Sequence, residues 1–419
     1  MAFFSPVVAI VASLCLLGIL LYKRVNLGIV LNVTALFLAA LALDWTQIPS
    51  VVYETTDPQS LDGRLTISVV LATFAIMLLS QLYKETGMID RLSENIGKMI
   101  KNPKVVLCTI PAVIGFLPVA GGALMSAPLV DSEAEKLGLK PDRKAYINLW
   151  FRHTIFPVYP ISQPLIVAAG LMGVAVPILI LRQIPVVLVM IVVGYVIGFW
   201  KIKNTEEKVR TGTTNNEDSN WRQLLTTFSP ILATIVVAIA LGLVGFGLSQ
   251  QGLDVLIATV AGLIVLIYVS RLNLKVFAKP FRGWAIYGIT FAAYGAFLLR
   301  KVMISAGISS IFQGLVTSGN VDIIIMLTAV PAILGLITGS PQGGVAIAAS
   351  ILAGIVTFSP NIAALVYISA YLGYTIAPTH LCFMFTARYF KCPLNKLYKY
   401  VIPSFIAAFA MALIVYYLV

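Results

Sequence analysis

Charged side chains are scarce in this sequence of 419 residues, at 11%, whereas apolar residues make up 59%. A single soluble core cannot bury so much apolar surface. Apolar runs of about 17 to 25 residues, long enough for a helix to cross a bilayer, recur along the chain. The alternation of polar and apolar residues that is typical of membrane-spanning strands is missing. These features exclude the soluble classes and predict an all-α membrane protein.

The N-terminal segment lacks the positively charged region of a signal peptide, so we expect the first span to be retained with the N-terminus outside. The net charge of +12 does not indicate nucleic acid as a partner, because most Lys and Arg residues lie in loops that this orientation makes cytoplasmic. Only Arg64, Arg182, Arg300 and Lys301 are predicted in outer loops. With about ten crossings, both termini are expected outside the cytoplasmic membrane. The lipid bilayer is the expected environment.

The predicted crossings form two sets of five. They lie near residues 6–21, 27–43, 65–82, 144–172 (with a break) and 185–200, and near 231–248, 255–269, 284–299, 362–385 (with a break) and 400–418. Between the third and fourth member of each set, Pro and Gly interrupt a short apolar segment, which is typical of a re-entrant hairpin. Short interfacial helices are expected at 89–99 and 308–316.

Short sequence blocks recur in the two sets and indicate an internal duplication. Both copies contain a Pro-Ala-x-x-Gly block, then a Gly-Gly pair, then a Thr-Ile-x-Pro block. The matching residues are 111–115 with 331–335, 121–122 with 343–344, and 154–157 with 375–378. Because each copy has an odd number of crossings, the second copy enters the membrane from the opposite face. The repeats are therefore expected to be inverted.

The expected organisation is two inverted repeats joined by a cytoplasmic linker, because the longest hydrophilic stretch falls between the two copies. Its parts are a first repeat (1–200) with a hairpin at 104–136 and a broken helix at 144–172, a linker (201–222), and a second repeat (223–419) with a hairpin at 321–358 and a broken helix at 361–387.

Four interruptions of helices at membrane depth form the candidate site. Two are hairpin tips, near Pro118 and Pro341, and two are helix breaks, at Pro157 with Pro160 and at Pro378. Unpaired backbone groups there must face protein, water or a ligand, and the new helix N-termini attract anions. Polar residues gather at the same places. The candidate substrate-binding residues are Gly121, Gly122, Ser126, Asn148, Arg152, His153, Thr154, Ser340, Gln342, Gly343, Gly344, Thr375, Thr379 and His380.

Carboxylates are missing from the predicted spans, and Arg152 is the only basic residue predicted within one. This disfavours a cation/proton antiporter built on an Asp pair and favours an anionic substrate. The two histidines, His153 and His380, are the only groups in the spans that titrate near neutrality, so they are the candidates if H⁺ is the coupling ion. The four cysteines show no ligand spacing and are interpreted as packing residues. No metal or cofactor is predicted.

A family resemblance rests on three features, the motif Pro118-Val-Ala-Gly-Gly-Ala-Leu-Met-Ser-Ala-Pro128, its partner Thr338-Gly-Ser-Pro-Gln-Gly-Gly344, and the paired Thr-Ile-x-Pro breaks. The chain resembles an uncharacterised prokaryotic multi-pass membrane family of the ion transporter superfamily, grouped with gluconate permeases, C4-dicarboxylate carriers and divalent-anion/sodium symporters. The resemblance implies inverted repeats, two hairpins that meet at a central site, organic-anion substrates, Na⁺ or H⁺ coupling and often a homodimer. Gly-Gly stands here where the divalent-anion symporters carry Ser-Asn-Thr.

The leading hypothesis is a secondary active transporter of a small organic anion, carrying a carboxylate, that works by alternating access and is coupled to Na⁺ or H⁺. A cation or metabolite exporter on the same scaffold is the alternative. An intramembrane enzyme is less favoured, because the spans contain no His-Glu-x-x-His, Asp-Asp or Ser/His/Asp set. Substrate, coupling ion, direction of transport and oligomeric state stay open at this point.

Overall fold

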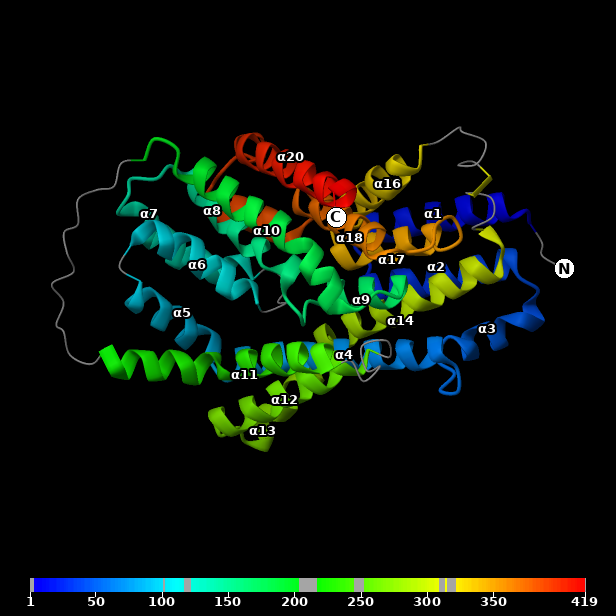
Figure 1. Ribbon diagram of the computed structural model, residues 1–419, viewed down its shortest axis with the longest axis horizontal. Coiled ribbons are helices and arrows are strands. Elements are labelled where there is room, and N and C mark those ends of the chain that lie inside the picture. The colour runs from blue at the N-terminus through cyan, green and yellow to red at the C-terminus, as the bar shows by residue number, and fades with distance from the viewer. Residues whose placement is uncertain are drawn as a thin grey trace.

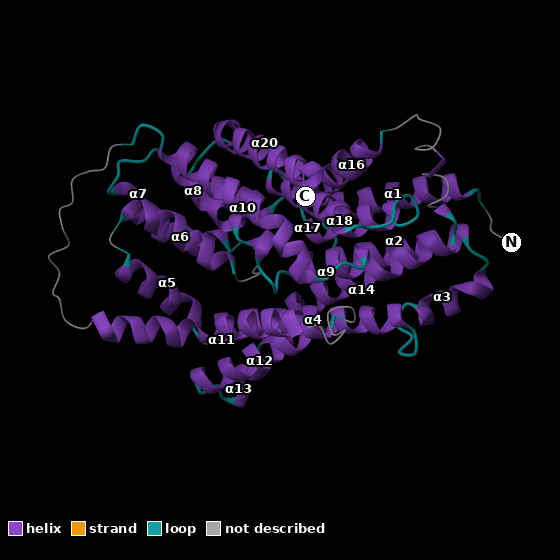
Figure 2. Ribbon diagram, in the orientation of Figure 1, coloured by secondary structure: helices purple, strands orange, loops and turns teal. Residues whose placement is uncertain are grey.

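The computed structural model describes residues 4–100, 102–116, 122–202, 217–244, 252–308, 313–314 and 322–418. This part of the chain is helical and contains no strand (Figure 2). Seven of its helical segments are long and apolar enough to cross a membrane, namely Leu61–Glu85, Pro141–Met172, Val176–Phe199, Trp221–Gly242, Leu253–Ser270, Trp284–Ser305 and Leu394–Leu418. The prediction of an all-α, multi-pass membrane protein is confirmed.

The elements follow one another as shown in Figure 1, and in the text α denotes an α-helix and η a short 3-10 helix. Those before residue 203 are α1 (Pro6–Tyr22), α2 (Leu27–Ala42), η1 (Trp45–Gln47), α3 (Ile48–Glu54), α4 (Leu61–Glu85), α5 (Met88–Met99), α6 (Pro103–Gly115), α7 (Ala123–Glu135), α8 (Pro141–Thr154), η2 (Phe156–Val158), α9 (Gln163–Met172) and α10 (Val176–Phe199). Those after it are α11 (Glu217–Val244), α12 (Leu253–Ser270), α13 (Leu274–Ala278), η4 (Pro280–Arg282), α14 (Trp284–Ser305), α16 (Ile323–Thr338), α17 (Pro341–Leu352), α18 (Pro360–Thr375), α19 (Leu381–Tyr389) and α20 (Leu394–Leu418).

Local sequence signals account for many of the helix starts. Asn26 and Asn102 precede α2 and α6, and each side-chain oxygen accepts a hydrogen bond from a backbone N–H of the first turn. Ser340 and Ser359 cap α17 and α18 in the same way, and each is followed by a proline at the first helical position. A proline there loses no helical hydrogen bond, because the first N–H groups of a helix have no partner within it.

The predicted span at 185–200 is wrong at its start, because α10 begins at Val176 and Pro185 lies inside it. Arg182, which was predicted in an outer loop, therefore belongs to a membrane-spanning helix. A proline within such a helix is tolerated where neighbouring helices cover the backbone groups that it leaves unpaired.

Other helices also extend beyond the predicted apolar run, and α4, which runs from Leu61 to Glu85, includes Arg64, which was predicted in an outer loop. Arg300 and Lys301 lie within α14, which continues to Ser305, and the Lys301 Nζ lies 2.8 Å from a carboxylate oxygen of Glu54. The predictions that these two basic residues lie in a loop, and that Arg152 is the only basic residue within a span, are therefore wrong. Helix α11 begins at Glu217, inside the predicted linker, and α20 begins at Leu394 rather than near residue 400. A helix can continue past the hydrocarbon because its backbone bonds are internal and long basic side chains reach toward water.

Three predictions fall partly or wholly outside the described residues. These are the first hairpin tip, including Pro118 and Gly121, most of the linker, and most of the interfacial helix at 308–316. The other predicted interfacial helix, at 89–99, is confirmed as a helix by α5.

The broken helices lie in the core, whereas the unbroken helices α11 and α20 are the most exposed of the membrane-spanning candidates. The segment Pro141–Met172 comprises α8, η2 and α9, and 83% of the residues in its apolar 18-residue stretch are buried. The corresponding fraction is 28% in Trp221–Gly242 and in Leu394–Leu418. In Figure 1 the labels of α9, α17 and α18 lie together near the middle of the molecule. The exposed apolar side chains of the outer helices suit a lipid environment.

Helices α6, α7 and α8 pack together, and so do α16, α17 and α18. Small residues allow the closest of these contacts. A methyl group added to Gly335 in α16 would overlap the carbonyl oxygen of Ala370 in α18, and one added to Gly373 in α18 would overlap that of Ala332 in α16. The backbones of α16 and α18 therefore touch directly, and only glycine fits at the crossing.

We predict that Gly335→Ala lowers stability by about 1–3 kcal/mol, because the added methyl forces the two helices apart. Thermal unfolding of the purified protein in detergent measures the effect. Gly18→Ala is the matched control, since Gly18 also lies in an apolar helix but has no atom within 4 Å of the added methyl. Equal unfolding temperatures for the two variants would contradict the close crossing of α16 and α18.

Candidate functional site

The two predicted helix breaks are present. Helix α8 ends at Thr154, the short turn η2 contains Pro157, and α9 begins at Gln163. Helix α18 ends at Thr375, and α19 begins at Leu381 after a turn that contains Pro378. At the second break, the Tyr374 carbonyl, four residues before Pro378, accepts a hydrogen bond from the Ala377 N–H at 3.1 Å. Proline has no N–H to donate to the carbonyl four residues earlier, so at the first break Pro157 and Pro160 leave the carbonyls of His153 and Phe156 without that donor.

Tyrosines from the second broken helix fill these positions. The carbonyl of His153 lies four residues before Pro157, and it accepts a hydrogen bond from the Tyr371 hydroxyl at 2.6 Å. The Tyr367 hydroxyl donates to the carbonyl of Phe156 at 3.5 Å. Both tyrosines lie on α18, so the backbone of the first break is completed by side chains from the other half of the chain.

The two histidines of the chain meet between the breaks. The ring centroids of His153 and His380 are 4.8 Å apart, with the planes nearly perpendicular. The Nδ1 atom of His153 lies 2.6 Å from the carbonyl oxygen of Leu149, and its Nε2 atom lies 3.3 Å from the Tyr374 hydroxyl. The Tyr374 and His380 rings are also in contact, with centroids 3.9 Å apart. Both predicted histidines therefore belong to one interior cluster.

Arg152 reaches from the first broken helix to the tip of the first hairpin. Its side chain is 1% exposed, and its guanidinium contacts the backbone of Gly122, the residue before α7. A methyl group on Gly122 would overlap this guanidinium. The glycine therefore lets a fully buried cation approach the N-terminus of the inner hairpin arm.

Asn148 ties the first hairpin to both broken helices. Its Oδ1 accepts a hydrogen bond from the Ser126 hydroxyl at 2.6 Å, and its Nδ2 donates to the Ala123 carbonyl at 2.9 Å. The same Nδ2 group donates to the Thr386 hydroxyl of α19 at 3.3 Å. The predicted residues Ser126 and Asn148 are thus brought together, and their polar atoms are used within the protein.

The second hairpin meets the second break in a similar way. The Thr379 hydroxyl donates to the carbonyl of Leu336 at 3.3 Å and lies against Gly339, the glycine that ends α16. Ser340 caps α17 through the N–H of Gly343. Gly344 packs against the backbone of α16, and Gly343 lies close to side chains of α2 and α16. The Gly-Gly pair of the second hairpin therefore serves close packing of the two arms.

Thr154 and Thr375 are buried, but their hydroxyls donate to carbonyls of their own helices, at 2.8 Å and 2.6 Å. Several other polar atoms at the breaks have no such partner. Within the part of the chain that the structure describes, the buried atoms without a hydrogen-bond partner include Ser162 Oγ, Gln163 Nε2, Gln342 Nε2, Ser369 Oγ and both ring nitrogens of His380, which lie on the broken helices or at the start of α17.

An unsatisfied buried polar atom costs about 1–3 kcal/mol, so a group of them in one region calls for an explanation. The helices that carry them pack against one another, α9 with α17 and α18, and α17 with α18. We refer to these five residues, together with Asn148, Arg152 and His153, as the central polar cluster. Water or a small ligand is the partner that such a cluster suits.

Sequence reasoning missed the roles of Tyr367, Tyr371 and Cys382. The tyrosines recur at helical spacing on α18, and the partner of Tyr371 lies four residues before a proline, which is the signal that could have identified it. Cys382 was interpreted as a packing residue, yet its thiol lies near both histidines. The spacing His380-Leu-Cys382 was the available signal.

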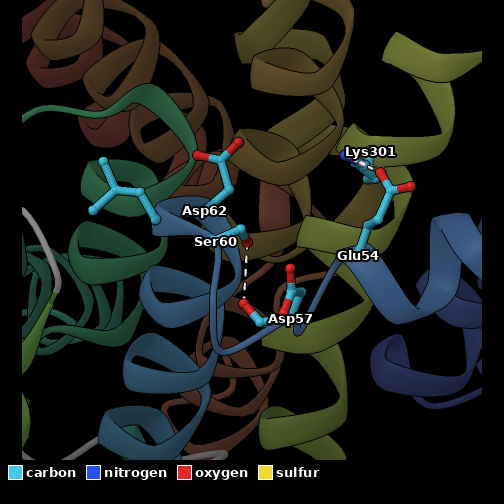
Figure 3. A pocket seen from close by; sticks show the side chains of 6 residues that line it. Glu54, Asp57, Ser60, Asp62 and Lys301 are labelled. Atoms are coloured by element: carbon cyan, nitrogen blue, oxygen red, sulfur yellow. Dashed lines mark hydrogen bonds and ion pairs between the residues drawn. The ribbon is translucent and has the colours of Figure 1, made fainter.

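A separate pocket of about 260 Å³ lies near the start of α4 (Figure 3). It is lined by Glu54, Asp57, Ser60, Leu61, Asp62 and Lys301. None of the predicted site residues lines it. The ion pair between Glu54 and Lys301 accounts for part of its charge.

We predict that Asn148→Ala destabilises the protein by about 1–3 kcal/mol, because the Ser126 hydroxyl and the Ala123 carbonyl lose a buried partner. Thermal unfolding measures the loss. Asn395→Ala is the control, since Asn395 is exposed and its side chain bonds only the N–H of the next residue among the described contacts. A stability loss no larger than that of the control would mean that Asn148 does not hold the hairpin in place.

No curated protein gives a significant match to the sequence. Among solved structures, the chain is similar to Neisseria gonorrhoeae MtrF, described as illuminating a class of antimetabolite efflux pumps, with 14% identity, a TM-score of 0.48, and coverage of 88% of this chain and 83% of that one. At that identity and score the likeness carries no functional argument. The model of the family described as "Protein of unknown function (DUF401)" matches residues 5–419, and the chain therefore belongs to this family.

Proposed function

We propose that this protein is a secondary active transporter of a small organic anion that carries a carboxylate. The observation that carries the proposal is the central polar cluster, a set of buried polar groups contributed by two broken helices in an otherwise apolar interior. Polar and charged groups at membrane depth are costly, and they are typical of substrate and ion pathways. Discontinuous helices whose ends meet near the centre of the fold are typical of transporters.

We further propose that the two halves are inverted repeats with two re-entrant hairpins, as in the ion transporter superfamily. The sequence repeat equates α7, α8, α9 and α10 with α17, α18, α19 and α20. The packing supports this equivalence, because contacts occur in reciprocal pairs. Helix α7 packs on α19, and their equivalents in the other half, α17 and α9, also pack on each other. In the same way, α8 packs on α20, and their equivalents α18 and α10 pack on each other. Two structurally equivalent halves that face opposite sides give the protein two alternative openings to one site.

An anion is the substrate that the chemistry of the site favours. Arg152 supplies a positive charge, and a guanidinium presents its donors in a planar fork that matches a carboxylate. Three helices begin at the cluster without a side-chain cap, α7 after Gly122, α9 after Ser162 and α19 after His380. Their backbone N–H groups and positive dipole ends attract the same charge.

The proposed transport is coupled either to Na⁺ or to H⁺, and the two ions would be bound by different chemical groups of the protein. Backbone carbonyls near the breaks are the oxygen ligands that Na⁺ would use. His153 and His380 are the groups that would carry a proton. We place the protein in the cytoplasmic membrane with both termini outside, because the basic residues concentrate in the loops that this orientation makes cytoplasmic.

Ligand-induced stabilisation tests the proposal directly. We expect at least one small carboxylate in a panel of mono-, di- and hydroxycarboxylates to raise the unfolding temperature of the purified protein, because binding to the folded state alone stabilises it. Repeating the panel with Na⁺ replaced by K⁺, and at two pH values, separates the two coupling ions. A panel in which organic cations stabilise and no carboxylate does would contradict an anion site.

Arg152→Gln is expected to abolish that stabilisation, and the uptake of the same anion into proteoliposomes, because removing one partner of a buried charge pair costs about 2–5 kcal/mol. Arg182→Gln is the matched control. It removes a partly buried arginine from the unbroken helix α10 and should leave binding unchanged. Equal anion affinity in the wild type and Arg152→Gln would remove the guanidinium from the substrate site.

A further inference from the structure

Three potential metal ligands lie together inside the central polar cluster. They are His153 on α8, His380 at the second break and Cys382 in the first turn of α19, and their ligand atoms all lie within 4.8 Å of one another. We propose that these side chains form a binding site for a thiophilic transition-metal ion, and that the ion is Cu⁺. This inference goes beyond the proposed transport function, and its test does not involve transport.

The hydrogen bonding of His153 presents a lone pair to this site. Its Nδ1 lies 2.6 Å from the carbonyl oxygen of Leu149, a distance and a partner that require Nδ1 to be the protonated nitrogen. In the neutral ring, Nε2 therefore carries a lone pair, and its only polar neighbour among the described contacts is the Tyr374 hydroxyl at 3.3 Å. A ring N–H held by a backbone carbonyl is the usual support of a metal-binding histidine.

His380 supplies an independent observation. Its side chain is 2% exposed, and neither ring nitrogen has a hydrogen-bond partner. Two unsatisfied nitrogens on one buried ring are costly without a ligand. The ring packs against those of His153 and Tyr374, which directs it into the space that the Cys382 thiol also borders.

The donor set indicates which ion fits. Two imidazoles and one thiolate, with no carboxylate, disfavour Mg²⁺, Ca²⁺ and Mn²⁺ and suit Cu⁺ or Zn²⁺. Binding converts the Cys382 thiol into a metal-bound thiolate and releases one proton to water. The resulting site is neutral with Cu⁺ and carries one positive charge with Zn²⁺. Because Arg152 precedes His153 and is itself buried, the neutral product is favoured.

The geometry requires only local movement. Bond lengths of about 2.0–2.1 Å to nitrogen and about 2.3 Å to sulfur place the three donors closer together than they lie here. Rotation of the His380 and Cys382 side chains can close that gap. His380 lies in the turn between α18 and α19 and is not held by a side-chain hydrogen bond.

The test is a chelator competition on the full-length protein, purified in detergent under reducing conditions. Cu⁺ is offered as its complex with a chromophoric chelator, and Zn²⁺ is offered in a parallel experiment with its own indicator. We expect the wild type to take one Cu⁺ per chain and to bind Zn²⁺ more weakly. Cys382→Ser should weaken Cu⁺ binding by at least about tenfold to a hundredfold.

Cys392→Ser is the matched control, because Cys392 and Cys382 are each 6% exposed and only Cys382 lies near the histidines. This control should bind Cu⁺ like the wild type. If Cys382→Ser does not fold, His380→Gln carries the same expectation. The proposal is overturned if the wild type takes no Cu⁺ from the chelator or if the site variants bind it as well as Cys392→Ser. Tighter binding of Zn²⁺ than of Cu⁺ overturns the choice of ion.

Discussion

The carbonyl oxygen that Pro157 leaves without a helical donor is the constraint on which the centre of this protein depends. An unpaired backbone group at membrane depth is costly, so the carbonyl of His153 needs another donor in place of the missing N–H. The Tyr371 hydroxyl provides it at 2.6 Å, from a helix that belongs to the other half of the chain. A local break in one helix is thus stable only when the second broken helix is packed against it. The interior position of both broken helices follows from this requirement.

Other bonds reinforce the same connection. Asn148 in α8 reaches Thr386 in α19, and the ring of His153 contacts those of Tyr374 and His380. The two broken helices are therefore expected to move as one unit. The hairpin arms are joined to this unit through few polar contacts, at Gly122, Asn148 and Thr379.

Proline and charge are rare and informative within apolar runs, and for that reason the sequence indicated the interruptions near Pro157 and Pro378 and the position of Arg152 within a helix. Helix ends were less predictable. Arg182 and Pro185 interrupt the apolar run, so the sequence did not indicate the first turns of α10. The helix nevertheless includes both residues. Partners distant in sequence were not predictable at all. Tyr371 is one of 17 tyrosines, and the carbonyl that it serves is 218 residues away. The meeting of Cys382 with two histidines likewise arises from packing and not from a local pattern.

Thiol accessibility distinguishes a water-accessible substrate site, as proposed for the central polar cluster, from a dry protein core. In a variant without native cysteines, Ser162→Cys places a thiol at a buried position whose native hydroxyl has no partner. Ser350→Cys places one on α17 at an equally buried position whose native hydroxyl donates to the Ala346 carbonyl. We expect a membrane-impermeant thiol reagent to modify the cysteine at position 162 much faster than the one at position 350, and a bound carboxylate to slow the reaction. Equal and negligible modification at both sites would contradict a water-accessible substrate site.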